Sequence, residues 1–344
     1  MQISGKLIND KIIVDKPKDV GRLYNKSHFG EALSGNKLEL DLLEGVFLLE
    51  EDKIKIFSNK SELNFDELVK IANQNITDFE IKYLVFKDLR KRGHVIKLCK
   101  EDKKINFYEF KNKFLITTFS ERDYLDIDET KKLLKTIKKD NKELWFAIVD
   151  EEGDLTYYKV NLLDINGLNK EYIYDKVQGI LLKNRVVIFD KEVSKNLHEK
   201  EFYGKPFGKG LQLSLVEAMY LFEKGIVDIQ TEDGKKISKE KLEQIIFKLQ
   251  PDFKSRLVVF KDLKKRGLIV KTGFKFGAHF RVYTSKPDDT HAEYLIHVVD
   301  KGFRSTWAEV SRAVRLAHSV NKEIIFARVD SDKIDFIDFG RLRP

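Results

Sequence analysis

Apolar and polar residues follow two spacings along this chain, and the two spacings alternate in a regular order. Short apolar runs rich in β-branched and aromatic residues predict strands, and apolar positions three or four residues apart predict helices. In the last third of the chain, the expected strands are 268–272, 279–283, 293–299, 323–329 and 334–339. A helix is expected at 306–320. The chain should therefore end in a module with the order β-β-β-α-β-β.

Upstream of this module, the pattern predicts helices in three places. Apolar residues at helical spacing, from Leu211 to Phe222, predict a helix over 211–223. A second helix should follow at 238–250, where Ser238 offers half of an N-terminal capping box. The third, at 260–267, has basic residues in its last turn and ends at a glycine, which suits a helix C-terminus.

The same pattern occurs twice along the chain. LVFKDLRKRGHVIK (84–97) returns as VVFKDLKKRGLIVK (258–271), at an offset of 174. LELDLLEGVFLLE (38–50) returns as LQLSLVEAMYLFE (211–223), and NKELWFAIVD (141–150) returns as NKEIIFARVD (321–330). A period of about 170 residues is far too long for a solenoid. We therefore predict a tandem duplication of a mixed-sheet α/β unit.

Composition narrows the class of partner and the compartment. The net charge of +8 favours an anionic partner, nucleic acid before membrane. No apolar run approaches the roughly 20 residues that a membrane span needs, and the N-terminus lacks the apolar core of a signal peptide. One cysteine, Cys99, excludes an internal disulfide framework and a cysteine-based zinc site. We therefore expect a cytoplasmic protein with no membrane contact.

The two repeats differ where polar residues could do chemistry. In the second repeat, Tyr283 closes one expected strand and His291 precedes the next. At an offset of 174 the first repeat has no histidine, and Glu109 is expected opposite Tyr283. Lys322 has a counterpart in the first repeat, Lys142, which on its own favours an ordinary surface lysine. A loop cap is the alternative interpretation of His291.

Together, Tyr283, His291 and Lys322 suit RNA cleavage without a metal. A base must take the proton of a ribose 2′-hydroxyl, and an acid must protonate the departing 5′-oxygen. A fixed cation must stabilise the charge that develops on the phosphate. Histidine titrates near neutral pH, lysine supplies a point charge, and tyrosine becomes a competent base when nearby cations lower its pKa.

At these residues the sequence resembles the archaeal tRNA-splicing endonuclease family. GFKFGAHFRVY, HAEYLIHVV and SRAVRLAHSVNKE look like that family's three catalytic blocks, in order. The resemblance implies Tyr283 as general base, His291 as general acid and Lys322 as transition-state cation. It implies excision of introns from precursor tRNA at bulge-helix-bulge motifs by metal-independent transesterification. The products would be 2′,3′-cyclic phosphate and 5′-hydroxyl ends, and no cofactor would be needed.

The resemblance also implies four domains and a homodimer. Each repeat would have an N-terminal α/β domain and a restriction-endonuclease-like C-terminal domain, and only the last would be catalytic. The expected domains are 1–82, 83–168, 169–255 and 256–344. An acidic loop of the degenerate copy would dock on the partner subunit, and it matches Asp150, Glu151, Glu152 and Asp154.

Two arginines of that family hold a flipped-out base of the RNA. Arg315 matches the first of them, and Arg341 matches the second, with Arg343 as a rival. Stacking of a base between guanidinium planes is physically reasonable for an RNA bulge.

Two other functions fit part of the pattern. Asp288 and Asp289 could suggest a magnesium-dependent nuclease, but no Glu-x-Lys follows on the next strand, so we expect no metal site. A scaffold that binds structured RNA without cutting it would use the same basic helix ends and aromatic loops. Cleavage of precursor tRNA in EDTA separates the three possibilities.

Overall fold

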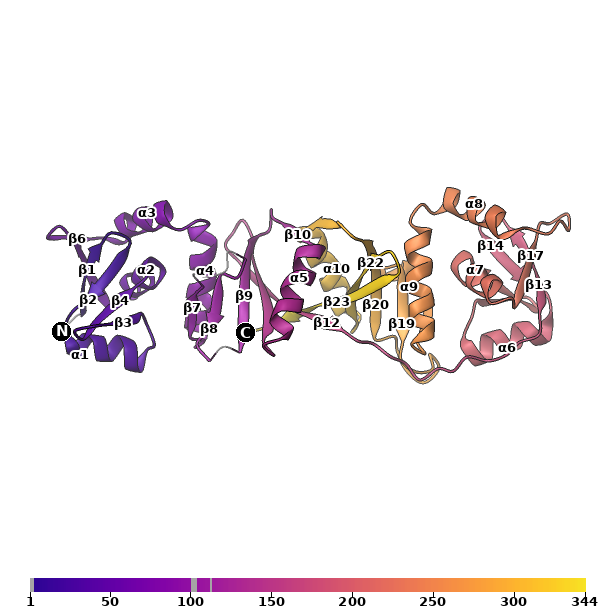
Figure 1. Ribbon diagram of the computed structural model, residues 1–344, viewed down its shortest axis with the longest axis horizontal. Coiled ribbons are helices and arrows are strands. Elements are labelled where there is room, and N and C mark those ends of the chain that lie inside the picture. The colour runs from indigo at the N-terminus through magenta and orange to yellow at the C-terminus, as the bar shows by residue number, and fades with distance from the viewer. Residues whose placement is uncertain (1–2, 100–103, 112) are drawn as a thin grey trace. The chain divides into compact units, whose positions relative to one another are not determined.

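The computed structural model describes residues 3–99, 104–111 and 113–344, which fold into two compact units (Figure 1). Unit 1 comprises Met1–Asp123, Ile137–Lys159 and Leu342–Pro344. Unit 2 comprises Tyr124–Thr136 and Val160–Arg341. Unit 2 thus holds the whole second repeat except its last three residues, together with two short segments of the first repeat, 124–136 and 160–168.

Unit 1 begins with a mixed sheet whose strand order is β3-β4-β2-β1-β5-β6. Its strands are β1 (Ile3–Ile8), β2 (Lys11–Val14), β3 (Glu31–Leu33), β4 (Lys37–Leu40), β5 (Ile54–Ser58) and β6 (Ser61–Leu63). The helices around it are α1 (Pro17–Val20), the π-helical η1 (Gly21–Lys26), α2 (Leu42–Glu50) and α3 (Phe65–Asn75). Helix α4 (Phe79–Lys91) then leads to strands in the order β11-β9-β8-β7, which are β7 (Ile96–Leu98), β8 (Phe107–Glu109), β9 (Phe114–Ser120) and β11 (Glu143–Val149).

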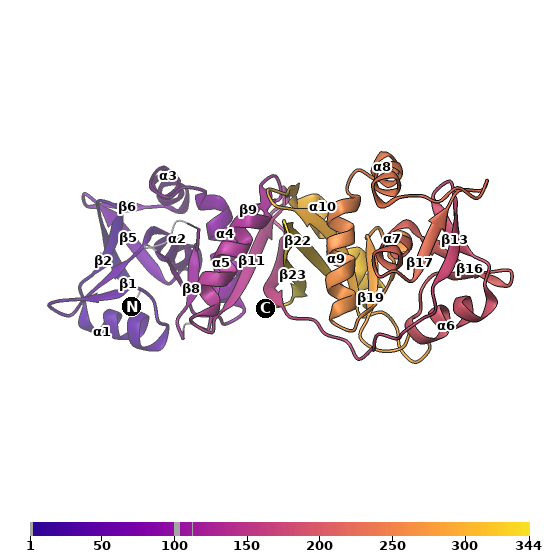
Figure 2. The ribbon, with the colours of Figure 1, turned by 45° about the vertical axis from the view of Figure 1, so that its right-hand side comes forward.

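Unit 2 repeats this plan. Its first sheet has the order β15-β16-β14-β13-β17, formed by β13 (Val177–Leu182), β14 (Arg185–Ile188), β15 (Lys205–Phe207), β16 (Gly210–Ser214) and β17 (Val227–Gln230). The helices that follow are α6 (Lys191–Glu201), α7 (Leu215–Glu223), α8 (Lys239–Leu249) and α9 (Phe253–Lys265). Helix α7 lies between this first sheet and α9 in both views (Figures 1 and 2).

The second sheet of unit 2 has the order β18-β19-β20-β22-β23. Its strands are β18 (Ile269–Thr272), β19 (Phe280–Tyr283), β20 (Tyr294–Asp300), β22 (Glu323–Asp330) and β23 (Lys333–Leu342). The 3₁₀ turn η2 (Phe274–Phe276) joins β18 to β19, and α10 (Trp307–Ser319) joins β21 (Arg304–Thr306) to β22. The predicted order of the C-terminal module is confirmed, with β21 as an addition. The mixed α/β class and the tandem duplication are also confirmed.

Two predicted helix starts and one predicted alignment are wrong. Helix α9 begins at Phe253, seven residues before the expected start at 260. Leu211 lies in strand β16, and helix α7 begins only at Leu215, after the N-cap Ser214. Leu98 pairs with Phe107 in the first repeat, and Thr272 pairs with Phe280 in the second. This register places Phe110, rather than Glu109, opposite the position of Tyr283. The segment that joins the paired strands is one residue longer in the first repeat (99–106) than in the second (273–279).

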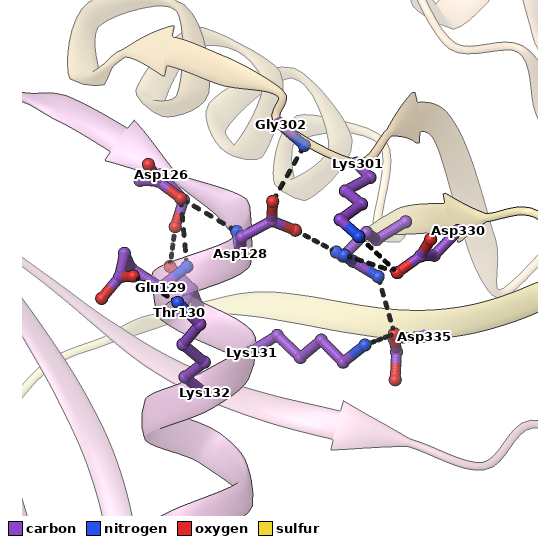
Figure 3. Close-up of polar contacts among 11 residues, drawn as sticks. Asp126, Asp128, Glu129, Thr130, Lys131, Lys132, Lys301, Gly302, Asp330 and Asp335 are labelled. Atoms are coloured by element: carbon purple, nitrogen blue, oxygen red, sulfur yellow. Dashed lines mark hydrogen bonds and ion pairs between the residues drawn. The ribbon is translucent and has the colours of Figure 1, made fainter.

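A cluster of charged side chains joins Asp128, from the first repeat, to Asp330 and Asp335 of the second repeat (Figure 3). Only 3% of the Arg328 side chain is exposed, and its guanidinium contacts the carboxylates of Asp128, Asp330 and Asp335. Asp128 belongs to helix α5 (Ile127–Lys138), which follows strand β10 (Tyr124–Asp126). Lys131 of the same helix lies 2.8 Å from Asp335. Lys301 lies 3.4 Å from Asp330, so three partly exposed carboxylates share the buried Arg328 and two lysines.

No helix in the described part of the chain is long and apolar enough to cross a membrane.

Candidate active site

Three backbone segments meet at one edge of the second sheet of unit 2. Strand β19 runs antiparallel to β20, and β20 runs parallel to β22. The end of β19 therefore lies beside the beginnings of β20 and β22, with Val282 opposite Tyr294 and Tyr294 beside Glu323. Tyr283 is the last residue of β19, and Lys322 directly precedes β22. The backbone thus brings Tyr283, Lys322 and the loop of His291 to the same edge.

Tyr283 is held rigidly at this edge. Only 8% of its surface is exposed, and it packs with Ile269 of β18, Ala292 and Phe202. The guanidinium carbon of Arg281 lies 5.9 Å from the centroid of the Tyr283 ring. In the described part of the chain, the Tyr283 hydroxyl makes no hydrogen bond shorter than 3.5 Å to a side chain. The phenol is fixed by packing and has an adjacent cation.

His291 lies in the loop 284–293, which is closed at its mouth by a carboxylate. Glu293 accepts hydrogen bonds from the Thr284 backbone N–H (3.0 Å) and from the Thr284 hydroxyl (2.6 Å). Within the loop, Thr290 donates to the Lys286 carbonyl at 3.2 Å. His291 itself is exposed, next to the buried Ala292. These contacts order both sides of a solvent-facing imidazole.

Lys322 follows helix α10 in the turn that leads into β22. Its backbone N–H donates to the Ala317 carbonyl at 2.9 Å, and its Nζ lies 5.6 Å from the centroid of the Phe276 ring. Lys322 forms no ion pair with a carboxylate among the described residues, whereas its counterpart Lys142 lies 3.7 Å from Asp140. The Nζ donates one long hydrogen bond, to the Val320 carbonyl at 3.4 Å, and its other N–H groups are available to an anion.

Asp338 is a buried carboxyl close to Glu323, the residue that follows Lys322. Burial and the neighbouring Glu323 raise the pKa of Asp338, on β23, to about 6. Burial, followed by Glu323, Glu293 and Asp338, also raises the pKa of Tyr294. One oxygen of Asp338 is buried without a hydrogen-bond partner in the described structure. This carboxyl is consequently the least well accommodated acidic group near the edge.

The two arginines expected to hold a base lie on separate elements of unit 2. Arg315 is exposed on α10, in the helix that precedes Lys322. Arg341 is exposed near the end of β23, and Arg343 is exposed beyond it, in unit 1. Neither Arg315 nor Arg341 forms an ion pair with a described carboxylate. Both guanidinium groups are open to a ligand.

The acidic loop of the first repeat is a tight turn between β11 and strand β12 (Leu155–Leu163). The Asp150 carboxylate accepts hydrogen bonds from the backbone N–H groups of Glu152 (3.0 Å) and Asp154 (2.8 Å), so it builds the turn. Glu151 pairs with Arg122 in the same unit. Glu152 and Asp154 are exposed. Two of the four acidic groups thus have a local role, and the other two face solvent.

Sequence patterns missed two residues of this site. Glu293 closes the loop of His291, and Arg281 stands beside Tyr283. Arg281 could have been found from its position, because alternate residues of a strand share a face and it precedes Tyr283 by two. The role of Glu293 depends on a hydrogen bond across the loop, for which the sequence has no local signal. Among the described residues, no group of three His, Cys, Asp or Glu side chains is placed to hold a metal ion.

Two family models match this chain, each of them twice. The tRNA intron endonuclease catalytic C-terminal domain matches residues 79–157 and 253–336. The N-terminal domain of the same family matches residues 3–69 and 177–243. The matched segments cover well over half of the chain and follow the internal repeat.

Curated relatives match in two length classes. The tRNA-splicing endonuclease of Methanococcoides burtonii is 36% identical over 98% of this chain and 99% of its own length. That of Methanosarcina barkeri is 32% identical over 98% of this chain and 99% of its own length. The tRNA-splicing endonuclease of Hyperthermus butylicus is 35% identical over 44% of this chain but 89% of its own length, so it matches a single repeat. The chain therefore belongs to the tRNA intron endonuclease family, with both of the family's domains present twice.

Proposed function

We propose that this protein excises introns from precursor tRNA at bulge-helix-bulge motifs, with all chemistry at the edge formed by β19, β20 and β22. The observation that carries the proposal is the register of these strands, which gathers Tyr283, Lys322 and the loop of His291. The first repeat keeps the register but has Phe110 in place of Tyr283 and a shorter connection, 111–113, in place of the loop 284–293.

In the proposed reaction, Tyr283 takes the proton of the ribose 2′-hydroxyl as the 2′-oxygen attacks phosphorus. The bond from phosphorus to the 5′-oxygen breaks, and His291 gives a proton to that oxygen. Lys322 stabilises the additional negative charge on the phosphate oxygens. The products are a 2′,3′-cyclic phosphate and a 5′-hydroxyl. The step needs no water, cofactor or metal, because every proton moves between the RNA and a side chain.

Arg315 and Arg341 are proposed to bind a bulge base by stacking, for which an exposed guanidinium is suited. We also propose the four domains 1–82, 83–168, 169–255 and 256–344, of which only the last is catalytic. The exposed acids of the loop 150–154 are proposed to dock on a second copy of the chain. Acidic side chains of one copy would be attracted to basic side chains of the other. We therefore propose a homodimer. Its expected location is the cytoplasm.

The test is incubation of the purified full chain with intron-containing precursor tRNA in excess EDTA. We expect excised intron and half-molecules that carry cyclic phosphate and 5′-hydroxyl ends, identified by their resistance or susceptibility to end-specific kinases and ligases. RNA that is bound but stays intact would favour a binding scaffold. Cleavage that EDTA abolishes would contradict the metal-independent mechanism.

A further inference from the structure

A cavity of about 650 Å³ opens in unit 2 between the hairpin β15–β16 and the strands β18–β19. Basic residues dominate its charged lining, which consists of Arg185, Lys205, Lys271, Lys275, Arg281 and the single acid Glu217. Lys205, Lys275 and Arg185 are exposed at its mouth. The cavity leads toward the active-site edge, because Arg281 lies on its wall and contacts the ring of Tyr283.

Two cations stand directly opposite each other on the wall of this cavity. Lys271 and Arg281 are register partners in the antiparallel pair β18–β19. Like charges in directly opposed positions destabilise a sheet. Lys271 has its own partners, since its Nζ donates to the carbonyls of Phe202 and Gly204, each at 2.6 Å, and lies 3.8 Å from the Glu217 carboxylate. The Nε of Arg281 is buried and has no hydrogen-bond partner among the described residues, which is costly for a buried donor.

The first repeat provides an internal control for this arrangement. It has a cavity of about 470 Å³ in the equivalent place, lined by Glu31, Lys97 and Tyr108 among others. Lys97 has the same structural role as Lys271, because it donates to the Gly30 carbonyl at 2.8 Å. The shared function of that lysine is therefore to hold the adjacent loop.

Two other positions change their charge between the repeats. The register of β15 with β16 places Lys205 where the first repeat has Glu31. The register of β18 with β19 places Arg281 where the first repeat has Tyr108. The fold therefore accommodates a glutamate and a tyrosine at these two positions. The copy that keeps the active-site residues has two cations there instead.

We propose that this cavity binds a phosphate group of the RNA strand next to the cleaved bond. Arg281 and Lys205 are the principal contacts, and Lys275 and Arg185 widen the cationic mouth. The phosphate would satisfy the buried donor of Arg281 and offset its repulsion from Lys271. Held there, the strand would have its 2′-hydroxyl fixed beside Tyr283. The identity of the strand as RNA rests on the proposed function.

The test replaces two cavity residues of the second repeat with their counterparts in the first. The double variant Lys205→Glu with Arg281→Tyr gives the second cavity the residues of the first. The first repeat folds with these residues at the same two positions. The control is Lys241→Glu, which makes the same lysine-to-glutamate change on helix α8 outside the cavity and adds a glutamate at the third position after the N-cap Ser238. The probe is intron-containing precursor tRNA with 2′-deoxy nucleotides at the cleavage sites, so that binding is measured without cleavage.

We expect the double variant to bind this RNA at least tenfold more weakly than wild type in 0.1 M salt. The slope of log affinity against log salt concentration should become shallower by about 0.7 for each lost phosphate contact. The single variant Lys205→Glu should show an intermediate loss, and the control should match wild type. Unfolding temperatures that match wild type identify the effect as one on binding.

Affinity and salt slope of the double variant equal to those of the control would overturn the proposal. A wild type that binds the RNA tightly but cuts no normal precursor tRNA would refute the proposed function and leave the binding comparison intact. A wild type that binds no RNA would overturn both.

Discussion

Phe110 occupies, in the first repeat, the sheet position that Tyr283 occupies in the second. Tyr283 ends strand β19, and Phe110 directly follows strand β8. The two side chains differ by one hydroxyl and in exposure, which is 8% for Tyr283 and 51% for Phe110. Duplication has thus produced a natural comparison between an edge with a phenol and an edge without one.

Tyr283→Phe should remove the base and leave the packing unchanged. We expect kcat for precursor tRNA cleavage to fall by about 10²- to 10⁴-fold, the usual contribution of a general base. RNA affinity and the unfolding temperature should stay within error of wild type, because Tyr283 packs through its ring. Single-turnover cleavage and binding of 2′-deoxy RNA give the two readouts. A kcat within threefold of wild type would show that another group is the base.

Glu293 should act through the position of His291. Glu293→Ala removes both hydrogen bonds to Thr284 and should loosen the loop 284–293. We expect kcat to fall about tenfold with KM nearly unchanged, since the loss affects the orientation of the acid. Glu293→Gln keeps an acceptor and should recover part of the rate. In the His291→Ala background, Glu293→Ala should have no further effect, and an additive loss would indicate a separate role.

Arg328 should be essential to the stability of unit 2. Arg328→Met leaves Asp128, Asp330 and Asp335 together without their buried cation. Lys131 and Lys301 remain as partners, but the three carboxylates lose the one cation that they share, so we expect the urea midpoint to fall. The matched control is Ile148→Met, at the corresponding position of β11 in the first repeat, where the described residues form no such network. Urea denaturation should separate the two variants clearly, and equal midpoints would refute the proposed importance of the network.

The buried carboxyl of Asp338 should make stability fall as pH rises. Its folded pKa of about 6 exceeds the value near 3.9 of an unfolded aspartate. Its unfavourable contribution is therefore absent below about pH 4, grows as pH rises toward 6, and is complete above that. Asp338→Asn should raise the free energy of unfolding at pH 7.5 by about 2 kcal/mol and have little effect at pH 4. The difference between the two denaturation series checks the sign, and an equal effect at both pH values would contradict it.

The sequence predicted the duplication and most helices and strands because the same order of apolar and polar residues occurs once in each repeat. It failed where a pattern fits two structures. Leu211 and Leu215 are four residues apart, a spacing that suits one helix face but also one strand face, and the strand β16 ends between them. The alignment of Tyr283 failed because the extra residue of 99–106 shifts the register after the best-matched segment. A fixed offset between the repeats does not show at which position an extra residue is inserted.

The sequence predicted those residues of the candidate site whose side-chain chemistry suits RNA cleavage. Tyr283 and His291 differed between the repeats, and Lys322 was indicated by the family resemblance. Glu293 and Arg281 act through contacts between neighbouring segments. The network of Arg328 joins residues 200 positions apart, which no local spacing reveals. Long-range polar contacts were thus the part that required the structure.

We propose that the second repeat cleaves RNA with Tyr283 as base and His291 as acid. The most direct measurement uses a precursor tRNA whose 5′-bridging oxygen at the cleavage site is replaced by sulfur, because a thiolate leaves without protonation. We predict that His291→Ala, slow by orders of magnitude on normal RNA, cleaves the sulfur substrate within about tenfold of wild type, while Tyr283→Phe stays slow on both. If the sulfur substitution fails to rescue His291→Ala, or if it rescues Tyr283→Phe equally, the assignment of acid and base is wrong.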